Sequence, residues 1–266
     1  VKQIIYRLFG NEDTMYLALQ QGDVDMVWSY SAGVAGTYQD VLAGDENVTL
    51  INVAAANAPA VLAFNNAKGL FTDENLRQAV SYALDYNAFK TYFGSAYAQV
   101  PNRGFVPETT VGYKQTEKLT TDQAKAAEYM AAAGYSEKNG NGFYVNAAGQ
   151  VASFTLTVNA AKEAHVGYAE MIKNQLEQFG IQVNLDTVDK DSYNAKTSNK
   201  FSENNITMEA AIYGYTAAGM GMGNGLGSIY VDGSHAVQGG CQVFDEAFQD
   251  ILSEMKAAKT IAEYYE

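Results

Sequence analysis

Cysteine, histidine, proline and tryptophan are scarce in this sequence, and the shortages exclude several kinds of structure. Cys241 is the only cysteine, so the chain can form no internal disulfide and no cysteine-based metal framework. Long hydrophobic runs are also missing, because no stretch approaches the roughly 20 apolar residues that a membrane-spanning helix needs. Two of the three prolines, Pro101 and Pro107, fall in one segment, which we therefore expect to be irregular.

Positive charge is the next shortage. The 17 lysines and arginines face 30 acidic residues, which gives a net charge of −13, and they are scattered singly. Nucleic acid is therefore excluded as a partner, because nothing would neutralise its phosphates. The hydrophobic content of 47% over 266 residues indicates a globular chain of one or two domains with a sizeable core.

Catalytic and cofactor chemistry have little support. His165 and His235 are the only histidines, and neither a nucleophile elbow nor a pair of carboxylates spaced for acid–base work is present. We therefore expect no catalytic residues, no cofactor and no metal site. His235 lies six residues before Cys241, a spacing that arises by chance, and we expect His165 at an exposed helix start. A secreted hydrolase that uses paired carboxylates is kept as an alternative.

The glycine-rich segment 214–233 does not form a phosphate-binding loop. Its glycines miss the G-x-G-x-x-G spacing, and no Gly-Lys-Ser/Thr follows them. A surface loop is the simpler interpretation of this segment.

Residues 60–85 carry the clearest pattern in the chain. Residues 60–64 predict a strand, and a helix follows that Thr72 or Asp73 can cap. The apolar stripe of this helix recurs at helical spacing, with Arg77, Gln78 and Tyr82 towards its sides; its members are Leu76, Ala79, Val80, Ala83 and Leu84.

The rest of the chain alternates between strand and helix patterns with short links, which indicates an α/β fold. Further strands are predicted over 2–9, 24–27, 48–56, 153–159, 181–185 and 206–213, with a short hairpin strand over 143–145. Further helices are predicted over 13–21, 33–43, 86–93, 120–133, 163–179, 191–198 and 244–259. A capping box at Thr260–Glu263 predicts one more helix start. Both ends of the chain look cut, so we expect an excised fragment.

Six short motifs, taken in order, resemble the bacterial extracellular solute-binding proteins of family 5, which serve oligopeptide, dipeptide and nickel ABC importers. They are Ala18-Leu19…Gly22-Asp23-Val24-Asp25, Phe64-Asn65…Leu76-Arg77-Gln78-Ala79…Ala83-Leu84-Asp85, Gly94…Pro101…Pro107…Gly112-Tyr113, Ala124-Lys125…Ala133-Gly134-Tyr135, Leu176…Gly180-Ile181…Val183…Leu185 and Gly214-Tyr215. The resemblance implies a periplasmic-binding-protein-like α/β fold (type II, cluster C). Residues 1–55 would be the end of the first lobe and the hinge approach, and residues 56–266 a second lobe truncated at its end.

The resemblance also implies a function. The chain would belong to the extracytoplasmic component of an ABC importer, a monomer that captures a peptide or related small ligand between two lobes and delivers it to a membrane permease. It would lie in the periplasm or be lipid-anchored at the outer face of the membrane. A protein of the same family that binds a nickel chelate is the alternative.

The ligand contacts implied by the resemblance follow two strands. Ser29 and Tyr30 would contribute first-lobe contacts, with Trp28 beside them in either the wall or the core. Tyr215, Thr216 and Ala217 would face the ligand from the second lobe, and Asn65 would lie near the hinge. Peptide binders of the family place an aspartate at about the position of Ala218, and its absence here puts peptide specificity in doubt.

Overall fold

The computed structural model describes residues 1–27, 34, 36–51, 57–93, 98–104, 113–198, 206–216, 241–242 and 245–266. Their elements, in chain order, are α1 (Glu12–Gln20), α2 (Gly36–Ala43), β1 (Asn57–Phe64), the 3₁₀ turn η1 (Gly69–Thr72), α3 (Glu74–Ala83), α4 (Tyr86–Phe93), α5 (Gln123–Ala132), β2 (Glu137–Lys138), β3 (Tyr144–Val145), β4 (Ser153–Asn159), α6 (Glu163–Phe179), β5 (Gln182–Val188), α7 (Lys190–Thr197), β6 (Ala210–Thr216), α10 (Glu246–Ala257) and α11 (Ile261–Tyr265). The predicted α/β class is confirmed, and most predicted elements appear within a few residues of their expected bounds.

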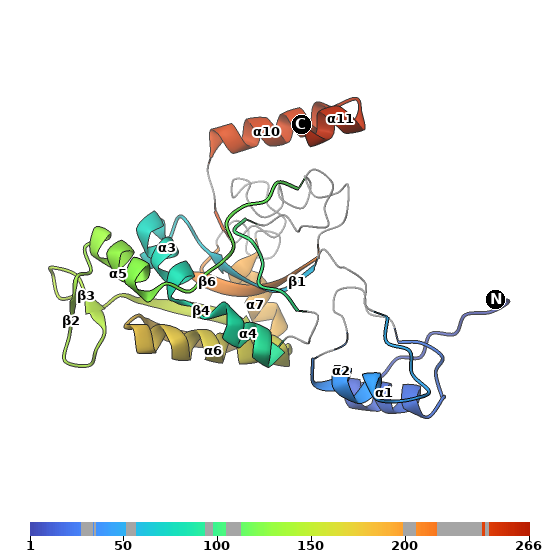
Figure 1. The fold of residues 1–266 in the computed structure, drawn as a ribbon. Coiled ribbons are helices and arrows are strands. Elements are labelled where there is room, and N and C mark those ends of the chain that lie inside the picture. Colours follow the sequence, from blue (N-terminus) through green and yellow to red (C-terminus); the bar gives the residue numbers. More distant parts are fainter. Residues whose placement is uncertain are drawn as a thin grey trace.

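A four-stranded mixed sheet in the order β1-β6-β4-β5 forms the centre of the molecule (Figure 1). β4 runs parallel to both β5 and β6, whereas β1 runs antiparallel to β6. The chain crosses from β4 to β5 through α6, and then from β5 through α7 to β6 on the other side of β4. These helical crossovers are what parallel neighbours require.

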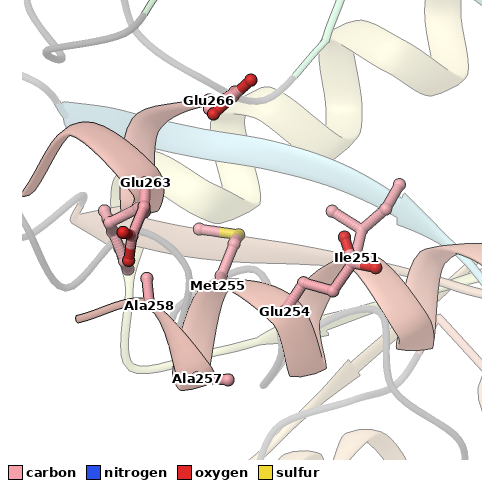
Figure 2. A pocket seen from close by; sticks show the side chains of 8 residues that line it. Ile251, Glu254, Met255, Ala257, Ala258, Glu263 and Glu266 are labelled. Atoms are coloured by element: carbon pink, nitrogen blue, oxygen red, sulfur yellow. The ribbon is translucent and has the colours of Figure 1, made fainter. Parts of the chain in front are cut away.

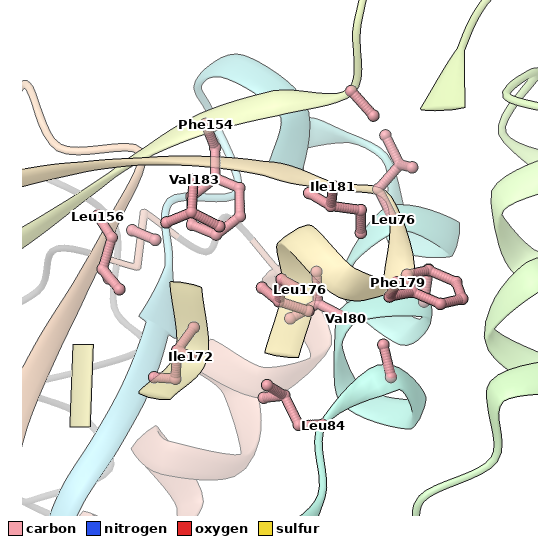
Figure 3. Packing of buried hydrophobic residues seen from close by; sticks show 14 of the residues in the cluster. Leu76, Val80, Leu84, Phe154, Leu156, Ile172, Leu176, Phe179, Ile181 and Val183 are labelled. Carbon is pink, nitrogen blue, oxygen red and sulfur yellow. The ribbon is translucent and has the colours of Figure 1, made fainter. Parts of the chain in front are cut away.

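The sheet buries residues on both faces. Along β6, Ala210 and Ile212 belong to the main core, whereas Ala211 belongs to a second cluster on the opposite face. This alternation follows from the two-residue period of a strand. The main core takes apolar side chains from α3, α5 and α6 as well as from β4, β5 and β6. Figure 3 labels part of this core, in and next to α3, β4, α6 and β5: Leu76, Val80, Leu84, Phe154, Leu156, Ile172, Leu176, Phe179, Ile181 and Val183.

Helix α3 bears out the stripe predicted from its sequence. All five stripe residues are buried, and the side chain of Asp73 caps the helix by accepting a hydrogen bond from the backbone N–H of Asn75. Tyr82, expected towards the side, is buried too. Its ring stacks on Tyr129 at 5.7 Å, and the guanidinium of Arg103 lies 4.1 Å from its centre.

Helix α5 begins later than its capping box predicts. The N-cap is Asp122, which accepts from the backbone N–H of Lys125, and not Thr120. The side chain of Gln123 instead donates to the carbonyl of Ala83, and that of Thr121 donates to the carbonyl of Leu84. These tertiary bonds satisfy the end of α3 and leave Gln123 unable to complete a local cap.

The predicted strands over 2–9 and 24–27 are wrong, and the one over 48–56 is not found in its described part, 48–51. A strand needs a neighbour to satisfy its backbone groups, and no described strand pairs with these segments. Ile5 and Leu8 are 78% and 94% exposed as a result. Helices α1 and α2 lie apart from the sheet (Figure 1).

Candidate functional site

The topology of the sheet makes one of its edges a candidate ligand site. From β4 the chain passes through α6, on one face of the sheet, to β5. From β5 it passes through α7, on the opposite face, to β6, which lies on the other side of β4 from β5. In open α/β sheets, ligands bind beyond the carboxyl ends of strands where the connections diverge in this way. The carboxyl ends of β4 and β6, at Asn159 and Thr216, therefore define the candidate site.

Two predicted ligand residues lie at this edge. Tyr215 and Thr216 are the last residues of β6, and their backbones pair with Ala58 and Asn57 at the start of β1. Ser29, Tyr30 and Ala217 lie outside the described residues, as do Trp28 and His235.

Asn65 lies at the opposite end of β6. Its backbone N–H donates to the carbonyl of Glu209, at 2.9 Å, just before that strand begins. Its side chain is buried, donates to the carbonyl of Met208 at 3.0 Å and accepts from the N–H of Ala67 at 3.0 Å. The structure therefore separates Asn65 from Tyr215 by most of the strand. A ligand role for Asn65 stays a prediction.

Asn66, the next residue, binds the segment around Cys241, a contact that the sequence did not indicate. The backbone N–H and the side-chain amide of Asn66 both donate to the carbonyl of Cys241, at 2.8 and 2.7 Å. The turn after β1 thus contacts a segment that lies 175 residues away in the sequence. Burial raises the pKa of the Cys241 thiol to about 12, so the thiol is protonated and unreactive at neutral pH.

The charged groups at the carboxyl edge are few and exposed. Asp189 caps α7 by accepting from the backbone N–H groups of Asp191 and Ser192, and these bonds and the Ser192 hydroxyl lower its pKa. Lys162 and Glu163, at the start of α6, face solvent. His165, expected to be exposed, is buried at 7%, because its turn packs on the sheet.

A separate hollow lies between α10 and α11 (Figure 2). It has a volume of about 510 Å³ and an apolar lining with three acidic side chains; the lining residues are Ile251, Glu254, Met255, Ala257, Ala258, Glu263, Tyr264 and Glu266. The helix start predicted at its edge is confirmed, since Thr260 caps α11 by accepting from the N–H of Glu263; the Glu263 carboxylate accepts from the N–H of Lys259 and not from that of Thr260. No motif of the sequence leads to this hollow.

In the part of the chain that the structure describes, no three histidine, cysteine or acidic side chains gather as metal ligands would. Among the same residues, no helix has the length and apolarity to cross a bilayer.

Comparison with known proteins agrees with the topology. Residues 1–232 match the family described as "Bacterial extracellular solute-binding proteins, family 5 Middle". The oligopeptide-binding protein AppA of Bacillus subtilis (strain 168) is 23% identical over 191 residues, which make up 70% of this chain and 33% of AppA. The chain thus spans about a third of this curated relative.

Solved structures share the fold over about half of their length. AppA in complex with a nonapeptide aligns with a TM-score of 0.74 and 18% identity, covering 97% of this chain and 49% of that chain. NikA from Brucella suis in complex with Fe(III)-EDTA aligns with a TM-score of 0.78 and 16% identity, covering 97% of this chain and 50% of that chain. DppA from Helicobacter pylori in complex with the peptide STSA aligns with a TM-score of 0.74 and 22% identity, covering 97% of this chain and 46% of that chain.

The family match covers most of the sequence, and the mixed α/β fold of the chain is the fold of these structures. This chain therefore belongs to the bacterial extracellular solute-binding proteins of family 5, a family of binding proteins and not of enzymes.

Proposed function

We propose that this chain is part of the extracytoplasmic solute-binding component of an ABC importer, which captures a small ligand at the carboxyl ends of β4 and β6. The family match over residues 1–232 carries this proposal. The divergent connections around β4 support it, because in open α/β sheets ligands bind beyond the carboxyl ends of strands whose connections part in this way. The protein would work as a monomer and hand its ligand to a membrane permease.

The proposal divides the chain between two lobes of the type II, cluster C arrangement. Residues 56–266 would form most of the second lobe, and residues 1–55 the end of the first lobe and the approach to the hinge. Two observations support this boundary. β1 starts at Asn57, and the main core takes its residues from that point onward, with none from α1 or α2. Closure of the two lobes about the hinge would then trap the ligand.

Tyr215, Thr216 and Ala217 would contact the ligand from the second lobe, and Ser29 and Tyr30 from the first. Tyr215 and Thr216 are the last residues of β6, at the carboxyl end that the proposal assigns to the ligand. Asn65, with its amide bonded to Met208 and Ala67, would act by holding the turn after β1.

Peptides are the first ligand class to test, since two similar structures hold a nonapeptide and the peptide STSA. A metal chelate is the second, because NikA holds Fe(III)-EDTA and NikZ from Campylobacter jejuni holds Ni(L-His).

Mass spectrometry of molecules that co-purify with the whole protein tests the proposal. We expect a stoichiometric small molecule that denaturation releases. Its absence, together with no shift in melting temperature across peptides and nickel–histidine, would contradict the proposal. Turnover of a glycoside or peptide substrate would favour a hydrolase instead.

A further inference from the structure

Strand β5 forms one edge of the central sheet, because β4 is its only neighbour among the described strands. The N–H of Gln182 donates to the carbonyl of Ala152 at 2.9 Å, and the carbonyl of Val188 accepts from the N–H of Ala160 at 2.8 Å. The backbone groups of Gln182 and Val188 therefore point towards β4 and the residues that flank it. Since this direction alternates along a strand, the backbone groups of residues 183, 185 and 187 point outward, away from the sheet.

Two side chains of α6 occupy the outward backbone groups of Val183. The Nζ of Lys173 donates to the carbonyl oxygen of Val183 at 2.8 Å, and the N–H of Val183 donates to the carboxylate of Glu177 at 3.4 Å. Lys173 and Glu177 lie one helical turn apart and also form an ion pair with each other. We call these two side chains the guard pair. Among the described residues, no side chain bonds to the outward groups of Leu185 or Thr187.

The guard pair does more than an ordinary ion pair on a helix surface. Its two side chains are 38% and 29% exposed, and ion pairs at such positions add little to stability. Here both charged groups are bonded to the backbone of an edge strand. Free N–H and C=O groups on such an edge are a template for a further strand, and charged side chains placed there prevent that pairing.

The position of the guard pair decides which pairings of two β5 strands are open. A closed dimer that continues the sheet has a two-fold axis, so its two β5 strands run antiparallel. With the axis at Leu185, Val183 pairs with Thr187 of the second copy, and all three outward residues form hydrogen-bonded pairs. The guard pair blocks this register because it occupies Val183.

The register that avoids Val183 is shorter and carries a charge conflict. With the axis at Asp186, only Leu185 and Thr187 remain to form hydrogen-bonded pairs within the strand. Asp186 then lies directly opposite Asp186 of the second copy, and like charges opposite each other destabilise a strand pair. Pairing through β5 therefore depends on access to Val183.

We propose that Lys173 and Glu177 keep the protein monomeric by closing the β5 edge to a second copy of this chain. The excluded contact is β5 against β5 of the second copy, antiparallel, with the axis at Leu185. This inference goes beyond the proposed function, because it concerns the edge of the sheet and holds whatever ligand the protein takes.

Sedimentation equilibrium of the 266-residue chain tests the proposal. The double variant Lys173→Ala/Glu177→Ala should self-associate at least about 10-fold more tightly than the parent chain, because Val183 becomes available for pairing. Lys162→Ala/Glu170→Ala is the matched control, since it removes one lysine and one glutamate from exposed positions at the start of α6 and within it. The control should associate as the parent does. Equal association of the two double variants would overturn the proposal.

A further substitution locates the contact. Thr187→Pro removes an outward N–H at an exposed position of the edge strand, where proline leaves the pairing with β4 intact. Added to Lys173→Ala/Glu177→Ala, it should return self-association to the level of the parent. Association that persists would place the contact elsewhere and overturn the proposal. Circular dichroism checks that each variant folds.

Amide hydrogen exchange on the parent chain needs no variant that must fold. The Val183 amide should exchange at least about 10-fold more slowly than the amides of Leu185 and Thr187, because only the first donates to the guard pair. Equal exchange of the three amides would show that the guard pair does not hold Val183, and would overturn the proposal.

Discussion

Tyr193 and Tyr213 each donate a hydrogen bond to the element that carries the other. The hydroxyl of Tyr193, on α7, lies 2.7 Å from the carbonyl oxygen of Ile212, and that of Tyr213, on β6, lies 2.6 Å from the carbonyl oxygen of Thr197. Their rings meet edge to face at 6.0 Å. These two bonds hold β6 against α7 just before Tyr215, so they set the position from which the strand enters the candidate site.

Tyr213→Phe should lower the free energy of unfolding by about 1–2 kcal/mol, because it leaves the carbonyl of Thr197, a residue that is only 1% exposed, without this donor. Urea unfolding followed by circular dichroism measures the change. Tyr135→Phe is the matched control, since the Tyr135 hydroxyl makes no hydrogen bond among the described residues. A loss no greater than the control's would show that the bond contributes nothing.

The buried tyrosines predict a loss of stability in alkali. Burial raises the pKa of Tyr168 to about 12 and also raises the pKa of Tyr193 and Tyr213, whereas an unfolded tyrosine ionises near pH 10. The folded state therefore keeps protons that the unfolded state loses. The stabilising contribution of these tyrosines to the free energy of unfolding is complete below pH 10, and it disappears as the pH rises through their folded-state pKa values.

Absorbance at 295 nm and circular dichroism, recorded together between pH 8 and 13, test this expectation. Exposed tyrosines should ionise first with the fold intact, and the last tyrosines should ionise only as the fold is lost. Ionisation of all 19 tyrosines near pH 10 with the fold retained would contradict it.

Cys241 should resist thiol reagents in the folded protein. Its thiol is buried and its pKa is raised to about 12, so labelling by DTNB at pH 8 should be slower by roughly 100-fold or more than in 8 M urea. Asn66→Ala removes the amide that donates to the Cys241 carbonyl and should speed labelling, because this segment is held less firmly. Asn146→Ala, in the turn that follows β3, is the control and should not change the labelling rate. Equal rates in all three proteins would show that Asn66 does not hold this segment.

Gly69 allows a close approach that alanine would block. It has a φ of +61°, and a Cβ there would meet the carboxylate of Glu209, whose other oxygen accepts from the N–H of Thr155 at 2.7 Å. Gly142 also has a positive φ, of +85°, but open space around it. Gly69→Ala should therefore cost about 1–3 kcal/mol of unfolding free energy more than Gly142→Ala. Equal urea midpoints would show that Glu209 moves aside freely.

Local patterns predicted the helices whose apolar stripe, cap or terminating glycine lies within or next to the helix itself. The stripe and cap of α3 were predicted from residues within a single helix, and α6 was predicted with its full bounds, because Gly180 ends it in the left-handed conformation. The elements that were predicted wrongly or with other bounds depend on partners that are distant in the sequence. Thr121 and Gln123 bond to α3 and shift the start of α5, and residues 2–9 lack a described strand beside them.

For the candidate site as well, some features follow from the sequence and others only from the tertiary structure. The order of the motifs determined the family, because that order belongs to the chain itself. Only the tertiary structure decided that Thr216 meets Asn57 at the open edge while Asn65 is buried at the other end. Strand register and direction depend on pairing between segments more than 140 residues apart, which no local pattern records.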